Sequence, residues 1–443
     1  MANKQVKNLA NSMEVVKYPD QADWRNLLRR PLLDHTELYP LVSRILEQVQ
    51  MNGDNAVKQF NLEFDKAEIE NLRVSQDEIS EALQSVDHSL KKAIEVAKQN
   101  IERFHSQQKF TGKVIETTPG VRCWQKAIPV EKVGLYIPGG SAPLFSTVLM
   151  LGIPAKLAGC RRIVLCTPPS AEGKIHPAIL YAAHLTGIEE IYKVGGVQAI
   201  GAMAYGTETI PSVYKIFGPG NQYVSAAKEL VNREGIAIDM VAGPSEVAVM
   251  ADETSNPSFI ASDLLSQAEH GPDSQVLLIS TSEKVVEGVL DEVDKQLEVL
   301  PRKEIAAMAL RNSKLVVVNN QDQMVEMINS YAPEHLIIVT KNYQELAGRI
   351  VNAGSVFLGK YTPESAGDYA SGTNHTLPTN GHAKVTGGVS LDSFIKKVTF
   401  QEISEYGIFN IGAAIESMAE AEQLQAHRNA VSIRLKDVFE NLK

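Results

Sequence analysis

Residues 214–221 read Tyr-Lys-Ile-Phe-Gly-Pro-Gly-Asn, and they join a short apolar run to a helical segment at residues 223–231. A buried strand that ends in a glycine turn and continues as a helix is the repeating unit of a parallel α/β sheet. The same order occurs twice upstream, where apolar runs at residues 162–166 and 191–194 each pass through a Pro- or Gly-rich turn. These three units predict a parallel sheet with helices on both faces.

A second series of the same kind occupies residues 246–359. Short apolar runs predict its strands at residues 275–279, 315–318, 336–339 and 355–358, with helices between them. The fold class expected is therefore α/β, with two parallel-sheet units that follow one another along the chain. A chain of 443 residues is long enough to build two such cores.

Three segments lie outside these two series. Residues 1–32 are polar and weakly patterned, which indicates an arm that packs on something else, for example a second subunit. Residues 75–108 predict one long helix, because Ser75 and Glu78 form a capping-box pattern and apolar residues recur at helical spacing. Residues 411–442 predict one or two helices in a C-terminal appendage.

Composition and charge argue against a nucleic-acid-binding, a secreted or a membrane protein. The net charge is −10, and there is no long basic run, which argues against a nucleic-acid partner. Three cysteines without metal-site spacing fit a reducing compartment. The N-terminus has no apolar core of signal-peptide length, and the most apolar long stretch, residues 142–160, is broken by prolines. We therefore expect a cytoplasmic protein with no membrane partner.

Gln267 and His270 lie three residues apart near the end of a predicted helix, so they share one face. Side chains with nitrogen and oxygen donors at this spacing can hold two corners of a zinc site. A structural reading is also open, in which His270 lies at the negative end of the helix dipole and Gly271 ends the helix. The pair alone does not decide between the two.

Glu334 and His335 come immediately before the predicted strand at residues 336–339. A carboxylate next to an imidazole suits general acid–base chemistry near neutral pH. Neighbours in an extended segment point to opposite sides, so both can face one substrate only if the loop bends, as Pro333 permits. A polar entry to the strand with a hydrogen-bonded histidine is the structural alternative.

Asp368 and His375 are expected in a loop rich in small residues, which would let the backbone approach a ligand closely. The structural alternative for Asp368 and His375 is a polar surface loop with Asx-type turns. His427 lies in the predicted C-terminal helical segment, where a position on a solvated helix face is its ordinary reading. The glycine loops at residues 138–140 and 218–221 suit phosphate groups, but neither matches the G-x-G-x-x-G dinucleotide fingerprint.

Several motifs together resemble the L-histidinol dehydrogenase family, and the resemblance extends from about residue 30 to the end of the chain. The motifs are residues 217–221 (Phe-Gly-Pro-Gly-Asn), 242–246 (Ala-Gly-Pro-Ser-Glu), 266–273, 332–335 (Ala-Pro-Glu-His) and 371–375 (Ser-Gly-Thr-Asn-His). Their order along the chain makes the resemblance far more specific than any single motif.

The resemblance implies a four-electron oxidation of L-histidinol to L-histidine through histidinal, with two NAD per turnover, at the end of histidine biosynthesis. It implies one Zn²⁺ per subunit and a homodimer whose subunits share the active site. The residues it implies are the zinc ligands Gln267, His270, Asp368 and His427, the last from the partner subunit; the catalytic pair Glu334 and His335; further substrate contacts at Ser245, His375 and Glu422; and the NAD contacts Tyr136, Gln198 and Asn221. The zinc ligands and His335 are expected to contact the substrate as well.

The resemblance also implies a division into domains, with two incomplete Rossmann-like domains and small terminal domains. An N-terminal arm takes residues 1–32, and an inserted NAD-binding domain takes residues 136–244. The zinc-site domain combines residues 33–135 with 245–389. The C-terminal appendage, residues 390–443, is expected to reach the partner's site.

Two other enzyme classes stay open beside this one. A dehydrogenase of the same superfamily would act on another small amino or sulfonated alcohol through an altered pocket. A zinc hydrolase would use the metal and Glu334 to activate water without a cofactor, although the repeated βα units favour the dehydrogenase. A non-enzymatic oligomer stabilised by zinc is the third reading, and turnover distinguishes it from the other two.

Overall fold

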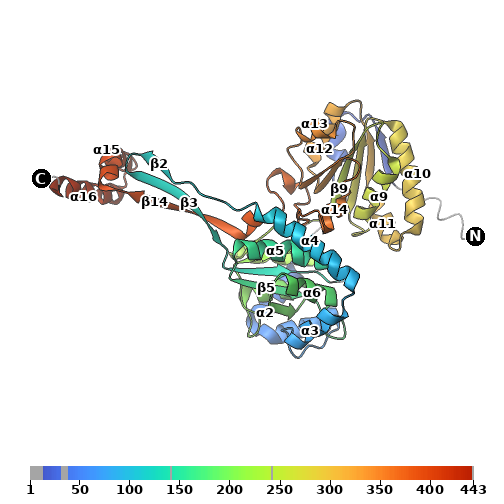
Figure 1. Ribbon diagram of the computed structural model, residues 1–443, viewed down its shortest axis with the longest axis horizontal. Coiled ribbons are helices and arrows are strands. Elements are labelled where there is room, and N and C mark those ends of the chain that lie inside the picture. The colour runs from blue at the N-terminus through green and yellow to red at the C-terminus, as the bar shows by residue number, and fades with distance from the viewer. Residues whose placement is uncertain (1–12, 31–37, 140–141, 241–242, 442–443) are drawn as a thin grey trace, which may run out of the picture.

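Two α/β bodies and a long projecting arm make up the molecule (Figure 1). The computed structural model describes residues 13–30, 38–139, 142–240 and 243–441. Each body is a parallel sheet between two layers of helices, whereas the arm is an antiparallel sheet that carries two helices at its tip. The α/β fold class predicted from the sequence is confirmed.

The five-stranded body is built on a parallel sheet with the strand order β6-β5-β4-β7-β8. Its strands are β4 (Lys132–Tyr136), β5 (Arg162–Thr167), β6 (Glu190–Lys193), β7 (Lys215–Phe217) and β8 (Ala237–Ile238). One face packs on α3 (Gln76–Ser85), α4 (His88–Ser106), α5 (Phe145–Ala158) and α6 (Pro177–Leu185). The other face packs on α2 (Leu38–Phe60), α7 (Gly196–Tyr205) and α8 (Gln222–Arg233). The strand order reverses beside β4, and such a reversal leaves a crevice at the carboxyl ends of the strands.

The six-stranded body has the strand order β1-β11-β10-β9-β12-β13, and every neighbouring pair is parallel. Its strands are β1 (Glu14–Lys17), β9 (Glu246–Ala251), β10 (Gln275–Ser280), β11 (Lys314–Val317), β12 (His335–Ile338) and β13 (Ser355–Leu358). The helices α9 (Pro257–Ala268), α10 (Glu283–Val299) and α11 (Lys303–Leu310) cover one face. The other face packs on α1 (Trp24–Leu27), α12 (Gln321–Tyr331) and α13 (Tyr343–Ala347). The remaining short helices are η4 (Gln21–Asp23), η5 (Asn61–Asp65), α14 (Glu364–Tyr369), η6 (His382–Lys384) and η7 (Leu391–Phe394).

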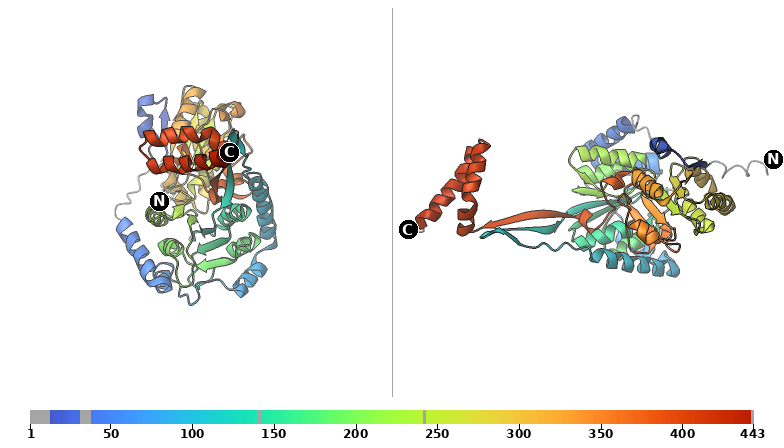
Figure 2. Two further views of the ribbon diagram at one scale, coloured as in Figure 1. Left: turned by 90° about the vertical axis from the view of Figure 1, so that its left-hand side faces the viewer. Right: turned by 90° about the horizontal axis from the view of Figure 1, so that it is seen from above.

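The arm extends far from both bodies (Figures 1 and 2). It consists of β2 (Ile115–Thr118), β3 (Val121–Pro129) and β14 (Ile395–Ile403), and β14 pairs with β3 in antiparallel register along its whole length. The helices α15 (Glu405–Ala421) and α16 (Gln425–Asn441) pack against each other at its tip. The sequence predicted these two helices but not the strand β14 that carries them.

The helix expected over residues 75–108 is two helices in the structure. The predicted capping box at Ser75 and Glu78 is present and begins α3. The chain then leaves helical geometry at Val86, and the Asp87 carboxylate accepts hydrogen bonds from the backbone N–H groups of Ser89 and Leu90 to begin α4. A side chain that caps a new helix therefore interrupts an apolar pattern that runs through both.

The packing of the helices differs from the domain division expected for residues 33–135. The helices α2, α3 and α4 contribute their apolar faces to the two cores of the five-stranded body, not to the six-stranded body that contains most of residues 245–389. In the segment expected to be an arm, residues 14–17 form the edge strand β1 beside β11. The rest of that arm at residues 1–12 and 31–32, and the loop residues Gly140 and Ala242, lie outside the described residues.

Candidate active site

The expected catalytic and metal-ligating residues of the six-stranded body gather at the amino ends of β9 and β12. Glu246 begins β9, His335 begins β12, and the two strands are direct neighbours in the sheet. The helix α9 follows β9 and runs back to the same end of the sheet, which brings Gln267 beside them. Segments separated by more than 60 residues thus meet because parallel βα units return to one edge.

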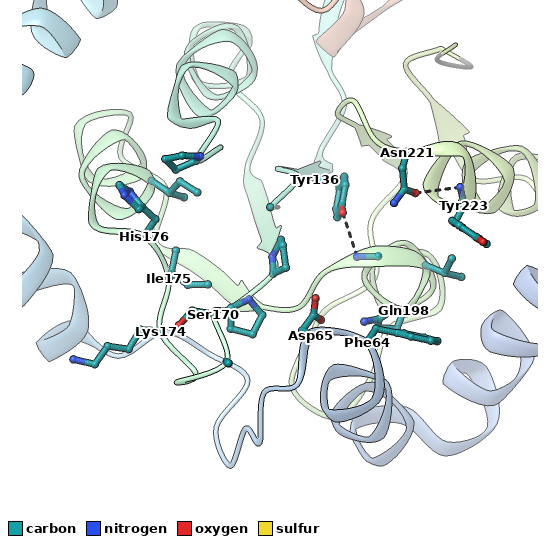
Figure 3. A pocket seen from close by; sticks show the side chains of 18 of the residues that line it. Phe64, Asp65, Tyr136, Ser170, Lys174, Ile175, His176, Gln198, Asn221 and Tyr223 are labelled. Atoms are coloured by element: carbon teal, nitrogen blue, oxygen red, sulfur yellow. Dashed lines mark hydrogen bonds between the residues drawn. The ribbon is translucent and has the colours of Figure 1, made fainter. Parts of the chain in front are cut away.

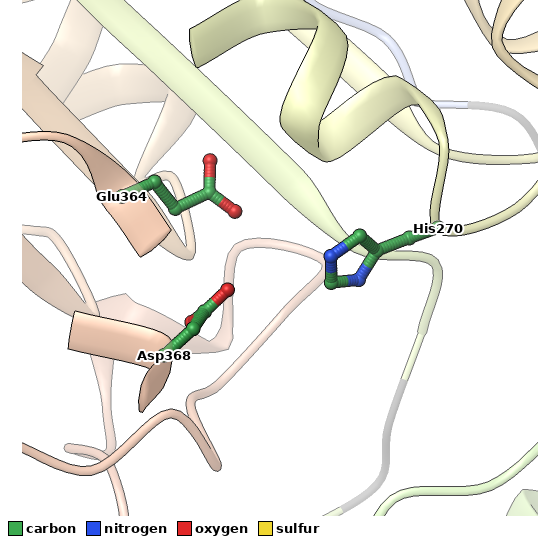
Figure 4. Close-up of side chains that lie close together, drawn as sticks. All are labelled: His270, Glu364 and Asp368. Carbon is green, nitrogen blue, oxygen red and sulfur yellow. The ribbon is translucent and has the colours of Figure 1, made fainter. Parts of the chain in front are cut away.

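His270, Glu364 and Asp368 form a cluster in which one ligand atom of each lies within 4.8 Å of the others (Figure 4). Glu364 and Asp368 lie four residues apart on α14, so both carboxylates point to the same side of that helix. Glu364 is buried, whereas His270 is exposed at the end of α9. One imidazole and two carboxylates are a donor set that suits Zn²⁺.

The amide of Gln267 adjoins this cluster and is fully buried. One end of the amide lies 2.8 Å from the Glu364 Oε1 atom, 3.2 Å from the Glu246 carbonyl oxygen and 3.2 Å from the His335 Nδ1 atom. Both oxygens are acceptors, so that end is assigned as the amide nitrogen, which donates to them. With the nitrogen engaged there, the amide oxygen faces the other way. Glu364 therefore fixes the orientation in which Gln267 offers an oxygen atom.

Glu334 and His335 face the same side of the chain, as the expected bend requires. The Glu334 Oε2 atom lies 3.7 Å from the His335 Nδ1 atom, and both side chains are buried. The backbone of Glu246 holds the pair: its N–H donates to Glu334 Oε2 at 2.9 Å, and its carbonyl lies 3.1 Å from His335 Nδ1. A carbonyl only accepts, so Nδ1 carries a hydrogen and the opposite nitrogen, Nε2, is directed into the site.

The Nε2 atom of His335 lies 3.6 Å from Asp368 Oδ1 and has no hydrogen-bond partner among the described residues. A buried polar atom without a partner is costly unless a ligand satisfies it. This atom lies between the pair Glu334–His335 and the cluster around Asp368. A substrate hydroxyl group placed here could donate its proton to the His335 Nε2 atom.

The bend before Glu334 depends on Ala332, which has a positive φ of 55°. A non-glycine residue in this region is strained, and such strain recurs at functional sites. Arg30 stabilises the turn by donating to the carbonyl groups of Tyr331 at 2.8 Å and Ala332 at 3.3 Å. The same guanidinium group pairs with the Glu246 carboxylate at 2.5 Å and lies over the Tyr331 ring.

Burial and neighbouring charges shift the pKa values of the ionisable groups in the site. Burial raises the pKa of Glu334 to about 7. Burial lowers the pKa of His335, but the carboxylates of Glu364, Glu334 and Asp368 outweigh burial and raise it well above the usual value. Burial also raises the pKa of Glu364, while for Asp368 the contact with His335 outweighs burial and lowers the pKa. A dication bound here would counter the field that these carboxylates exert on His335.

The loop after α14 connects the two bodies at the site. His375 Nδ1 lies 3.0 Å from the Asp368 carbonyl, and its Nε2 atom lies 3.1 Å from the Thr147 hydroxyl group on α5. The neighbouring Asn374 amide donates to the Met150 carbonyl at 2.6 Å. His375 therefore stands where the six-stranded body meets α5, and Ser245 is half-buried immediately before β9.

Tyr136, Gln198 and Asn221 line one cavity of about 920 Å³ in the five-stranded body (Figure 3). They follow or end strands: Tyr136 ends β4, Gln198 lies in the first turn of α7 after β6, and Asn221 caps α8 after β7. The Tyr136 hydroxyl accepts from the Gly196 N–H at 3.2 Å, which ties β4 to α7. The cavity occupies the crevice at the carboxyl ends of the strands where α/β sheets bind nucleotides.

A sequence profile described as histidinol dehydrogenase matches residues 28–435. The chain belongs to the histidinol dehydrogenase family. It is 61% identical over 426 residues to a histidinol dehydrogenase of Bacteroides fragilis (strain YCH46), a match that covers 96% of this chain and 100% of that protein. The histidinol dehydrogenase of Escherichia coli (strain K12) is 51% identical over 414 residues, which cover 93% of this chain and 94% of that protein.

The fold agrees with this membership of the histidinol dehydrogenase family. The crystal structure of histidinol dehydrogenase from Elizabethkingia anophelis superposes with a TM-score of 0.95 and 55% sequence identity, covering 96% of this chain and 99% of that one. The family resemblance inferred from the sequence motifs is therefore confirmed. In the part of the chain that the structure describes, no helix combines the length and apolar character needed to cross a bilayer.

Two residues expected in the site of a histidinol dehydrogenase lie elsewhere in this chain. Glu422 follows α15 and His427 lies in α16, and both are exposed at the tip of the arm. Figures 1 and 2 show the arm tip far from the amino ends of β9 and β12. Within one chain these two side chains do not meet the cluster around His270.

Sequence reasoning missed Glu364, Glu246 and Arg30. Glu364 had a signal, because it precedes Asp368 by four residues and follows a proline that begins α14. Glu246 acts through its backbone groups as well as its carboxylate, and Arg30 is more than 200 residues away in sequence. Glu246 ends the motif at residues 242–246, but no local pattern shows that it pairs with Arg30 or holds Glu334 and His335.

Proposed function

We propose that this chain oxidises L-histidinol to L-histidine through L-histidinal, using two NAD per turnover, as the last steps of histidine biosynthesis. One observation carries the proposal: the pair Glu334–His335 lies 3.6 Å, through His335 Nε2, from the carboxylate-rich cluster around Asp368. Acid–base groups beside a potential metal site, with a nucleotide-sized cavity in the adjoining body, suit a metal- and NAD-dependent alcohol dehydrogenase. Membership of the histidinol dehydrogenase family supports the choice of substrate.

The residues present fit a zinc ion. Gln267, His270 and Asp368 would hold it from one chain, with Gln267 offering its amide oxygen while its nitrogen donates to Glu364. Glu364 lies close enough to be an additional or alternative ligand. His427 of a second copy would complete the set, because α16 cannot reach the site of its own chain.

The residues present also fit NAD. Tyr136, Gln198 and Asn221 would contact it in a cavity of about 920 Å³, which is large enough for much of a dinucleotide. When bound, zinc would orient the imidazole and amine of histidinol, and NAD would accept the hydride of each oxidation. The remaining steps belong to side chains of this chain.

His335 is the proposed base for the alcohol step. Its Nδ1 hydrogen is held by the Glu246 carbonyl, so its Nε2 atom is the one that would take the hydroxyl proton. In the aldehyde step the same nitrogen would take a proton from the hydrated aldehyde. A positioned base of this kind contributes on the order of 10²–10⁴-fold to the rate.

Glu334 is the proposed activator of water between the two oxidations. Its carboxyl group has a pKa of about 7 and is held in place by the Glu246 N–H. It can therefore accept a proton from water at neutral pH while that water adds to the aldehyde. The alcohol step needs no such water.

Further contacts would fix the substrate. His375 lies where the six-stranded body meets α5, and would reach a ligand held between Asp368 and α5. Ser245, half-buried immediately before β9, would add a hydroxyl group. Glu422 of a second copy would supply a carboxylate for the substrate amine. The working unit is therefore proposed to be a homodimer that exchanges its arms.

The test is to count NADH. Purified, zinc-loaded protein is given a limiting amount of L-histidinol with excess NAD, and NADH and histidine are both measured. Two NADH per histidinol, with histidine as product, is the expected result. No NADH from folded, zinc-containing protein would overturn the proposal and favour another amino or sulfonated alcohol, while product without NADH would favour a hydrolase.

A further inference from the structure

We propose that Asp65 and Phe64 form the adenosine end of the cofactor site, and that Asp65 selects NAD over NADP by accepting hydrogen bonds from the ribose hydroxyl groups. This inference rests on the proposed function, because it assigns roles within the proposed NAD cavity. Both residues line that cavity (Figure 3). Neither belongs to the three contacts implied by the family resemblance.

The segment that carries the two residues has an unusual backbone. Residues 61–65 form the π-helix η5, and the next residue, Lys66, takes a left-handed conformation with φ of 58°. π-Helical turns are rare and recur at functional sites. The turn is anchored, since the buried Asn61 amide donates to the Lys193 carbonyl at 2.7 Å and its oxygen accepts from Gln198 at 3.4 Å. The anchor joins η5 to the cofactor wall made by Gln198.

The Asp65 carboxylate is held in the cavity without a partner. Its Oδ2 atom is inaccessible to solvent and has no hydrogen bond within the described part of the chain. Burial raises the pKa of Asp65 to about 6, so the group is mostly ionised at neutral pH. Figure 3 shows it beside Gln198 and below Tyr136. The carboxylate is half-buried, and an inaccessible oxygen without a partner is costly, so a hydroxyl group of a ligand would satisfy it.

Phe64 offers an apolar surface next to that carboxylate. Its side chain is 48% exposed although it lines the cavity. The ring stacks on Phe60 with the centroids 5.6 Å apart and the planes 4° apart, which fixes its orientation. A flat, supported aromatic ring suits a purine base, and a base beside a carboxylate is the arrangement that adenosine requires.

The positions of α2 and α5 on opposite faces of the sheet indicate which end of the cofactor lies beside Asp65 and Phe64. Asp65 follows α2, which packs on the face of the sheet covered by α7 and α8. The opposite face carries α5, whose Thr147 contacts His375 of the reacting site. The nicotinamide must reach His375 and His335, so it lies toward α5. The adenosine then lies on the α2 side, against Asp65 and Phe64.

A 2′-phosphate would be repelled at this position. The phosphate of NADP would bring negative charge against the half-buried Asp65 carboxylate and would replace a hydroxyl group that donates to it. The cavity does contain a cation, Lys174, but its ammonium group pairs with Glu81 at 3.3 Å, and Figure 3 shows the chain running away from Asp65. The nearby Lys66 donates to the Glu63 carbonyl.

The experiment measures cofactor binding without turnover. Dissociation constants of NADH and NADPH are determined from the fluorescence of the bound nicotinamide, and those of ADP-ribose and its 2′-phosphate by calorimetry. Three proteins are compared: the unmutated chain, Asp65→Asn, and the control Glu63→Gln. Glu63 is an exposed carboxylate on the same turn, so the control removes an equal charge outside the cavity. Thermal unfolding checks that each variant is folded, and Asp65→Ser serves if Asp65→Asn is not.

The unmutated protein is expected to bind NADH about 100-fold more tightly than NADPH. Asp65→Asn should weaken NADH binding about 10-fold and reduce the NADH-to-NADPH preference by a similar factor, because a charge-assisted acceptor and a repulsive charge are lost together. Glu63→Gln should leave both constants unchanged. The inference is overturned if Asp65→Asn keeps the original preference, or if the unmutated chain prefers NADPH. Failure of the unmutated protein to bind either dinucleotide would instead overturn the proposed NAD dependence.

Discussion

The substitution Arg30→Met tests whether a buried ion pair supports the reacting site. The Arg30 guanidinium donates to both carboxylate oxygens of Glu246, at 2.5 and 2.7 Å, and the two side chains are only 16% and 3% exposed. Methionine keeps the apolar stem of the side chain but removes the charge. The Glu246 carboxylate would then be buried without its counter-charge, retaining one hydrogen bond from the Asn380 N–H at 2.7 Å.

The expected cost is large for a single side chain. Breaking a buried pair by removing one partner costs about 3–5 kcal/mol, and the hydrogen bond from Asn380 argues for the lower end, about 3 kcal/mol. For a body of this size, 1 kcal/mol lowers the melting temperature by about 2–4 °C. The six-stranded body of Arg30→Met should therefore melt about 6–12 °C lower than that of the unmutated protein.

The assay is thermal unfolding of the full chain, together with NADH formation at a temperature where both proteins are folded. Activity should also fall, because the Glu246 backbone positions Glu334 and His335, and small displacements of reacting groups cost up to about 10²-fold. The control is Arg162→Met, whose partner Glu190 lies at 3.0 Å in a more exposed pair. Exposed pairs contribute about 0–1 kcal/mol. If Arg30→Met melts within about 2 °C of this control and keeps full activity, the reasoning is wrong.

Two further substitutions test the roles assigned within the site. Glu334→Gln should slow NADH formation from histidinal more than from histidinol, because only the aldehyde step needs activated water; equal losses in the two half-reactions would contradict that role. Glu364→Gln should weaken zinc binding about 10–100-fold, since Glu364 orients the Gln267 amide and is itself part of the cluster with His270 and Asp368. Zinc retention during dialysis against a chelator measures this, and unchanged retention would remove Glu364 from the metal site.

Most of the strands that were predicted in the two bodies are short apolar runs that lie buried in the sheets, whereas the exposed edge strand β1 was taken for part of an arm. The central residues of β5 and β10, 163–166 and 276–279, are apolar and buried, and such short apolar runs predict buried strands. The strand β14 could not be found in this way, since it is mostly exposed and its partner is β3, about 270 residues earlier. Its pairing depends on register between distant segments, for which a local pattern has no signal.

In the site, too, residues that form a local sequence pattern could be predicted, whereas contacts between residues far apart in sequence could not. Glu334 and His335 were visible as adjacent acid–base residues, and the capping residue Asn221 was visible in its glycine loop. The contacts that position them come from Arg30 and the Glu246 backbone, which only the folded chain brings close. The break of the predicted long helix at Asp87 was equally hidden, because a helix-capping side chain does not disturb the apolar spacing around it.

The arm explains why the expected ligand His427 is remote in one chain. The helices α15 and α16 expose large apolar side chains, among them Tyr406, Phe409 and Met418, at the end of an extended arm. Such an exposed surface is typical of a segment that packs on another copy. A second copy would then bring His427 and Glu422 to the cluster around His270.

Mixing two inactive variants tests this shared site most directly. His270→Ala and His427→Ala are each expected to lose zinc and activity as pure proteins. After the subunits are exchanged, each mixed dimer should hold one intact site, with His270 from one chain and His427 from the other. Random exchange makes half of the dimers mixed, so activity should return to about a quarter of the unmutated value. No recovery, although mass spectrometry shows that mixed dimers have formed, would contradict a site assembled from two chains.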